Sequence, residues 1–204
     1  MIRQAPAFFN QAPTIEVYDP LAQFLGASSD GLITYQFSDA VALAGHSCPT
    51  VASAYLMTRA ALKALYGNDI PVRGNIAVAW QDERDEGVTG VMAAVVTLIT
   101  GAADDSGFKG IGGYFQRSER VHFGEAIAGE VRFTRLDTGK SVQVSADLSR
   151  IPLAVQARAL LPLCIQGQAT IEQQREFGAL WQERVRAILL EHADDPSVFQ
   201  LKLG

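Results

Sequence analysis

Residues 45–65 read GHSCPTVASAYLMTRAALKAL, and this stretch decides how the first half of the chain folds. From Thr50 to Leu65 most residues are apolar or strong helix formers, which predicts a buried helix. Pro49 suits the first position of that helix, because the amide hydrogen that proline lacks has no partner there. Cys48 is therefore expected at the N-cap.

The same bend places an imidazole two residues from a thiol, in a chain that has only three histidines and two cysteines. Unpaired N–H groups and the helix dipole favour an anion at the N-cap, so the Cys48 thiolate should form more easily than in water. Zinc binds imidazole nitrogen and thiolate sulfur. The bend therefore predicts His46 and Cys48 as ligands of a transition metal, with zinc the first candidate. The alternative is a buried cysteine beside a loop histidine, without chemical function.

An acidic turn follows an apolar strand at Asn75 to Trp80 and precedes an apolar helix at Gly87 to Thr100. Four of the five residues 82–86 are carboxylates, and most of them are expected to be solvated or to cap the helix. Glu86 stands directly before the helix and is the one best placed to point inward. We therefore expect Glu86 as a further metal ligand.

Residues 101–113 form a glycine-rich stretch, GAADDSGFKGIGG. Its residue order does not match a phosphate-binding P-loop, and no helix clearly follows it. Closely spaced glycines nevertheless let a ligand approach the backbone, and a lysine can hold an anion. Lys109 is therefore expected to orient an anionic substrate, the alternative being an ordinary surface loop.

The remaining pattern predicts an α+β fold with a mixed or antiparallel sheet, since strict alternation of strands and helices is absent. A short helix is expected from Pro13 to Phe24 and a strand from Leu32 to Phe37. Two strands flank a hairpin turn at Asp137 to Lys140. Helices are expected at 152–163 and 170–193, the second beginning with a capping box.

Three segments result from this pattern: an N-terminal arm with a short helix (1–30), an α+β metal-binding core (31–150) and a C-terminal helical extension (151–204). The last helix carries an apolar stripe at helical spacing, more than a tail on its own domain needs. The stripe predicts a homodimer, because two-fold association is the commonest way to bury such a surface. Its members are Phe177, Leu180, Trp181, Val185, Ile188 and Leu189.

Composition restricts the class of protein further. A net charge of −5 without a basic cluster argues against nucleic acid as a partner. The longest apolar stretch, Val88 to Ile99, is too short to cross a bilayer, so no membrane association is expected. The N-terminus lacks the apolar run of a signal peptide. Two cysteines far apart, Cys48 and Cys164, do not make a disulfide framework, which favours the cytoplasm.

The run Ala-Gly-His-Ser-Cys-Pro before an alanine-rich helix resembles the FmdE family, named for a component of formylmethanofuran dehydrogenase, whose members carry G-H-x-C-P at a helix start. The later Leu-Ile-Thr-Gly-Ala run (98–102), followed by a loop with glycine and lysine, is similar to a second segment of that family. The resemblance covers about residues 31–150. It implies an α+β core, often dimeric, with zinc at His46 and Cys48. Ala102 stands where the family usually has a cysteine.

Three functions are compatible with these residues. The first is a metal-binding protein with a small-molecule cleft built from the His46–Cys48 bend, the acidic turn and the glycine-rich loop. The second is a metal-free enzyme in which Cys48 is the nucleophile and His46 the base. The third is a non-catalytic accessory protein that carries a metal or cofactor to a larger complex.

Overall fold

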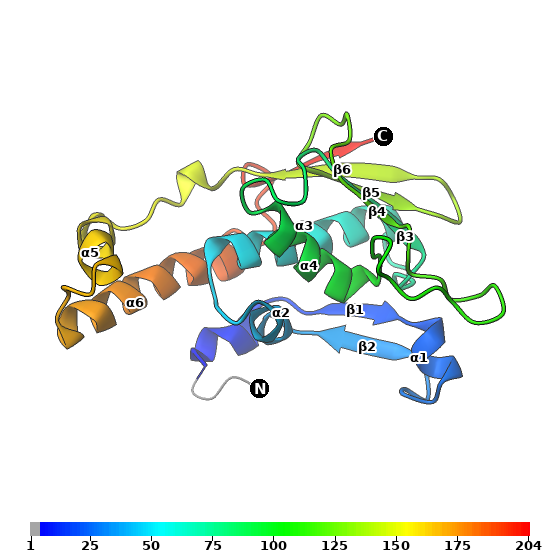
Figure 1. The fold of residues 1–204 in the computed structure, drawn as a ribbon, viewed down its shortest axis with the longest axis horizontal. Coiled ribbons are helices and arrows are strands. Elements are labelled where there is room, and N and C mark those ends of the chain that lie inside the picture. Colours follow the sequence, from blue (N-terminus) through cyan, green and yellow to red (C-terminus); the bar gives the residue numbers. More distant parts are fainter. Residues whose placement is uncertain (1–4) are drawn as a thin grey trace.

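The computed structural model of the chain describes residues 5–204, so the first four residues of the predicted arm lie outside the described part. Helix α3 (Pro49–Tyr66) runs through the middle of the molecule, and helix α4 (Thr89–Thr100) packs beside it (Figure 1). The helix predicted from Thr50 to Leu65 is therefore confirmed. It begins at the proline, with Cys48 as its N-cap, and ends at Gly67.

The main sheet has five strands in the order β4-β3-β5-β6-β7. These strands are β3 (Ile76–Trp80), β4 (Val121–His122), β5 (Val131–Arg135), β6 (Ser141–Ala146) and β7 (Phe199–Leu203). Only β3 and β4 pair in parallel, and the other neighbours are antiparallel. The sheet is thus mixed, and the predicted α+β class is confirmed.

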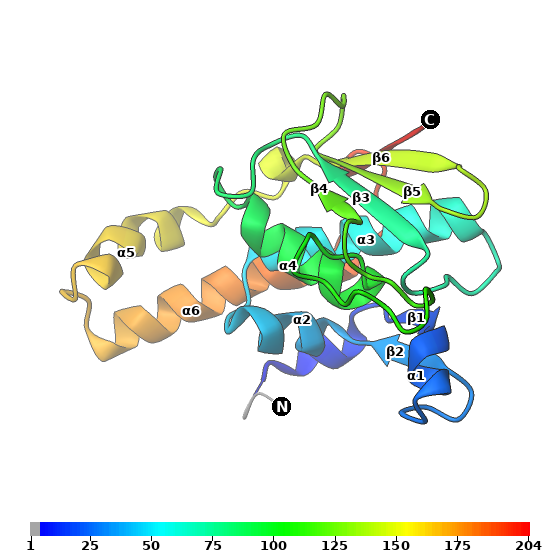
Figure 2. The same cartoon turned by 45° about the vertical axis from the view of Figure 1, so that its right-hand side comes forward.

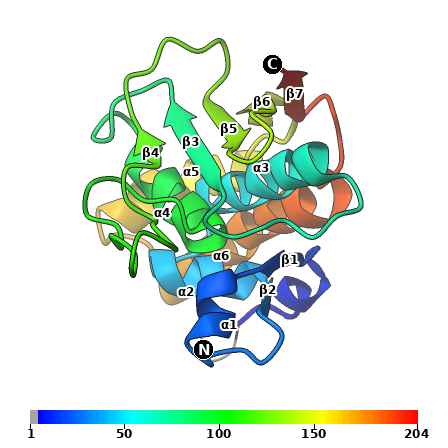
Figure 3. The same cartoon turned by 90° about the vertical axis from the view of Figure 1, so that its right-hand side faces the viewer.

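A separate two-stranded sheet lies on the other side of α3 (Figure 3). It pairs β1 (Ile15–Tyr18) with β2 (Leu32–Tyr35) in antiparallel register. The helix predicted from Pro13 to Phe24 is therefore wrong in its first half. Residues 15–18 alternate between buried and less buried positions, as a strand does, and only α1 (Pro20–Phe24) is helical.

Asp19 makes the change from strand to helix abrupt. Its carboxylate accepts hydrogen bonds from the backbone N–H groups of Leu21 and Ala22, at 2.9 and 3.2 Å. Pro20 then occupies the first helical position. An aspartate cap followed by proline is a strong helix start.

Five further helices complete the part of the fold that the structure describes, before the last turn and strand. They are the 3₁₀ helices η1 (Ala7–Gln11) and η2 (Leu148–Arg150), and the α-helices α2 (Phe37–Ala44), α5 (Val155–Ile165) and α6 (Ile171–Arg186). The predicted capping box of the last helix forms between Thr170 and Gln173. This helix ends earlier than predicted as regular α-helix, because a π-type turn, η3 (Ala187–Glu191), follows it. Within residues 5–204, no helix has the length and apolar content needed to span a bilayer.

The C-terminal extension is not purely helical. Helix α5 and the first half of α6 form a hairpin that projects from the body of the molecule (Figures 1 and 2). The chain then returns, and β7 adds an edge strand to the main sheet by pairing with β6. The sequence FQLKL at 199–203 alternates in the way a strand requires, and the prediction missed it.

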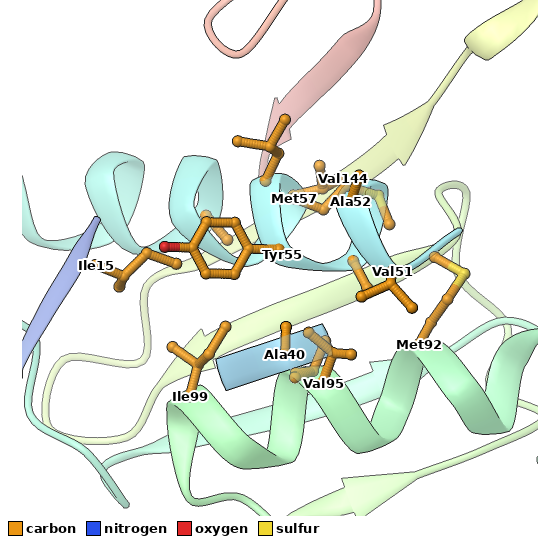
Figure 4. Close-up of a cluster of buried hydrophobic side chains, with 14 of the residues drawn as sticks. Ile15, Ala40, Val51, Ala52, Tyr55, Met57, Met92, Val95, Ile99 and Val144 are labelled. Atoms are coloured by element: carbon orange, nitrogen blue, oxygen red, sulfur yellow. The ribbon is translucent and has the colours of Figure 1, made fainter. Parts of the chain in front are cut away.

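The hydrophobic core joins α3 to both sheets and to α4 (Figure 4). Val51, Val95 and Ile99 are fully buried between the two helices. Tyr55 is also fully buried, and its hydroxyl shares its one hydrogen between the backbone oxygens of Pro13 and Tyr35, at 2.8 and 3.0 Å. Burial raises the pKa of the Tyr55 hydroxyl well above its usual value. This hydroxyl connects the N-terminal strands to the central helix.

Candidate functional site

The bend that carries His46 and Cys48 is set by the ends of two helices. Helix α2 ends at Gly45, whose φ of +76° lies in the left-handed region that glycine tolerates. Cys48 then caps α3, and its Sγ accepts a hydrogen bond from the Val51 N–H at 3.5 Å. The thiol is thus held at a helix N-terminus, as the sequence predicted, and it is buried.

His46 is exposed at the outer side of this bend. Its Nδ1 lies 2.9 Å from the backbone oxygen of Ala44. A carbonyl oxygen only accepts, so Nδ1 carries a hydrogen, and in the neutral ring Nε2 has the lone pair. The imidazole is therefore oriented with Nε2 available as a base or as a ligand.

The C-terminal helix α6 fixes the same bend, although more than 130 residues of sequence separate the two. Trp181 Nε1 and Gln182 Nε2 both donate to the backbone oxygen of Ser47, at 3.1 and 3.2 Å. The Ser47 hydroxyl in turn donates to Gln182 Oε1 at 2.9 Å. Sequence reasoning missed these contacts, because no local pattern links the two segments.

A groove runs along the exposed side of α4 and begins at His46. A cavity of about 290 Å³ is lined by His46, Val91 and Val95, and a second of about 360 Å³ is lined by Leu98, Val121 and Phe123. Both cavities share Leu43, Gly90 and Ala94 as walls, so they lie next to each other along α4. We call this surface the α4 groove. Its middle is apolar and carries no bulky side chain at positions 90 and 94.

The far end of the α4 groove is polar. Arg84, from the acidic turn, forms an ion pair with Asp104, from the glycine-rich loop, at 2.6 Å. The N–H and hydroxyl of Ser106 donate to the same carboxylate at 3.0 and 2.5 Å. The hydrogen bonds from Ser106, with a smaller contribution from the Arg84 charge, hold the Asp104 pKa below its usual value. Asp104 is therefore ionised at neutral pH.

Two predicted site residues do not line the α4 groove. Glu86 was expected to point inward, but it is exposed. Lys109 is also exposed, and its Nζ donates to the backbone oxygen of Asp105 within its own loop. The acidic turn and the glycine-rich loop do reach the groove, through Arg84 and Asp104 rather than through these two residues.

The part of the chain that the structure describes holds no complete set of metal donors around the His46–Cys48 bend. Across residues 5–204, no group of three or more histidine, cysteine, aspartate or glutamate side chains is arranged so that it could hold an ion. His46 and Cys48 supply two donors in one bend, and Glu86 lies on an exposed turn. His46 and Cys48 are two of the four ligands that a closed zinc site takes, so a site at this bend would need further donors.

The chain matches no family model and no curated protein sequence.

Proposed function

We propose that this protein binds a small molecule with an apolar body and an anionic group in the α4 groove. The observation that carries the proposal is that two adjacent cavities with shared walls extend from His46 to the Arg84–Asp104 pair. Ligand sites are typically concave and mostly apolar, with a few polar groups that orient the ligand. Arg84 and Arg73 both line the polar end, and a guanidinium group there can donate hydrogen bonds to an anionic group.

His46 supplies the chemistry in this proposal. Its side chain lines one end of the groove, and the Ala44 oxygen holds Nδ1, which leaves Nε2 unused. Such an imidazole accepts a proton from a bound molecule or binds a metal. Binding without turnover would make the protein an accessory or carrier protein, and turnover that depends on His46 would make it an enzyme.

The test is binding of anilinonaphthalene sulfonate, an apolar anion of the proposed class, measured by titration calorimetry. Ala94 is exposed and lines both cavities, so Ala94→Phe fills the α4 groove without disturbing the core. We expect this variant to weaken binding at least about tenfold, equivalent to about 1.4 kcal/mol. The matched control is Ala159→Phe, at an exposed alanine on the projecting helix α5. Equal affinities in the two variants would refute the groove as the binding site.

A transition metal at His46 and Cys48 is a second proposal, supported by the shared bend and by the resemblance to the FmdE family. Glu86 would bind the metal only after rearrangement of its turn. The remaining coordination positions of the metal would therefore be filled by water, by the small-molecule ligand or by another chain. Elemental analysis and zinc titration test the proposal. Cys48→Ser should abolish uptake, whereas His122→Ala should retain it. Wild-type protein that takes up no zinc, nickel, iron or copper would refute it.

The metal-free alternative, with Cys48 as nucleophile, is supported by the hydrogen bond that Val51 donates to Sγ, because such a bond stabilises a thiolate. Cys48 has an exposed fraction of only 8% and does not line the groove cavities. A substrate would therefore reach the thiol only if the bend opens. Activity that survives chelation but not alkylation of Cys48 would support this alternative over the metal site.

We also propose a homodimer in the cytoplasm. The apolar stripe is buried in the core of its own chain at Val185 in α6 and at Ile188 and Leu189 in η3. Only the part of the stripe on the projecting half of α6 is left to contact a partner. The projecting hairpin of α5 and α6 exposes Val155, Ile165 and Ile171, with exposed fractions of 76%, 76% and 64%. The cytoplasm is supported by both cysteines being free.

Light scattering tests the dimer. The expected particle has twice the chain mass of 22.0 kDa, and the Ile165→Asp, Ile171→Asp double variant should be monomeric. A wild-type protein of single-chain mass at micromolar concentration would contradict the proposal.

A further inference from the structure

A third cavity, of about 210 Å³, is lined by three arginines. Arg73 reaches it from the segment before β3, and Arg117 and Arg120 reach it from the segment before β4. Asn75 and Gln116 add amide groups to its wall. None of these residues belongs to the motifs that the sequence singled out, and the cavity is distinct from the α4 groove except for Arg73.

The positive charge around this cavity is only partly balanced. Asp19 pairs with Arg117 at 2.6 Å and with Arg73 at 2.8 Å, and its side chain has an exposed fraction of 4%. Among the described residues, no carboxylate pairs with Arg120, whose pKa is lowered by burial alone. One carboxylate therefore faces three guanidinium groups, which leaves two positive charges unbalanced.

Arg117 shows that the surroundings of the cavity are built for charge rather than left open by chance. Its side chain is only 6% exposed, and Nε and Nη1 have no hydrogen-bond partner among residues 5–204. A Cβ added at Gly74 would overlap this guanidinium, so only glycine at this position leaves room for it. A buried guanidinium with unused donors is costly unless further negative charge is nearby.

The rim of the cavity is held in an uncommon conformation. Phe115 has a φ of +62°, a left-handed value that is rare for an aromatic residue. Its ring stacks on Phe24 of α1 at a centroid distance of 5.1 Å. Backbone strain of this kind clusters at binding sites and persists only where the surrounding structure enforces it.

We propose that this cavity binds a doubly charged oxyanion, with a phosphate group as the best match. Two unbalanced positive charges correspond to one dianion rather than to a single carboxylate. Planar guanidinium groups donate pairs of N–H bonds to phosphate oxygens, and Arg120 has these donors available. The volume suits a phosphate group better than a complete drug-sized ligand, which needs a larger pocket.

The test is titration of the full chain with inorganic phosphate at about pH 8, where the phosphate carries close to two charges. Arg120→Gln should weaken binding at least about tenfold, the loss typical of a charged hydrogen bond. Arg132→Gln is the matched control, because it removes one half-buried arginine from β5. It should change the affinity less than about twofold, since its charge does not face the cavity.

Two further ligands define the chemistry. Acetate should bind far more weakly than phosphate, because it carries one charge. Phenyl phosphate that binds more tightly than the free ion would identify an esterified phosphate as the ligand, and equal binding would identify free phosphate. The proposal fails if wild-type protein shows no phosphate binding, if Arg120→Gln binds phosphate as wild type does, or if acetate binds equally well. Ala94→Phe should retain phosphate binding, so failure here is distinguishable from failure of the α4 groove.

Discussion

Asp19→Asn should be one of the most destabilising single substitutions in this protein. The substitution keeps an oxygen that caps α1 but removes the carboxylate that pairs with both Arg73 and Arg117. Arg73 loses less, because it is partly exposed and also donates to the Leu98 backbone oxygen. Arg117 is left buried without its charged partner. Breaking a buried ion pair by removing one partner typically costs about 3–5 kcal/mol, and we expect a loss in this range.

Urea unfolding followed by circular dichroism measures this loss as a change in the free energy of unfolding. The matched control is Asp30→Asn, since Asp30 also accepts a backbone N–H, from Leu32, but is exposed. It should change stability only slightly. A loss below about 1 kcal/mol for Asp19→Asn would refute the reasoning. It would mean that water or a rearranged side chain solvates the Arg117 charge once the carboxylate is gone.

The pH dependence of stability tests the same carboxylate. Burial alone would raise the pKa of Asp19, but the hydrogen bond from Arg73 and the charge of Arg117 outweigh it and hold the pKa below its usual value. The stabilisation by Asp19 is therefore complete above the unfolded-state pKa of about 3.9 and is lost as the pH falls through the lower folded-state pKa. The difference in stability between wild type and Asp19→Asn should shrink below about pH 4. A constant difference down to about pH 2 would contradict this.

Two other substitutions test the packing around the sites. Gly74→Ala should lower stability by about 2 kcal/mol or more, because φ is +86° and the new Cβ overlaps Arg117; unchanged urea unfolding would contradict it. Trp181→Ala should lower stability by about 2 kcal/mol, less than for a fully buried tryptophan. It should also speed alkylation of Cys48, because the hydrogen bond to Ser47 that holds the bend is lost. Mass spectrometry after iodoacetamide treatment measures this, and an unchanged rate would show that α6 does not control the bend.

The parts of the fold that were predictable from the sequence have local causes. Pro49 and Gly67 define α3 to within about one residue, and the turn at 137–140 defines a hairpin between β5 and β6. The first strand was mistaken for a helix because Val17 and Leu21 are also spaced as on a helix face. Two-residue alternation from Ile15 to Tyr18 decides in favour of the strand, because it buries one face in the core.

The candidate site was predictable only in outline. The bend at His46, the acidic turn and the glycine-rich loop do reach one groove, but the sequence could not indicate which side chain of each would face it. Glu86 and Lys109 were chosen for their chemistry, whereas Arg84 and Asp104 face the groove. Contacts over long sequence separations, such as that between Asp19 and Arg117, depend on the packing of whole elements and leave no local pattern.

The most direct test of the central claim is the map of backbone amide shifts when anilinonaphthalene sulfonate is titrated into the isotopically labelled protein. If the α4 groove is the ligand site, the largest shifts fall on His46, Gly90, Ala94 and Ser106, which line it from end to end. Shifts that are absent from these four residues and concentrated elsewhere, for example at Ala64 and Leu201 in the cavity beside β7, would contradict the claim.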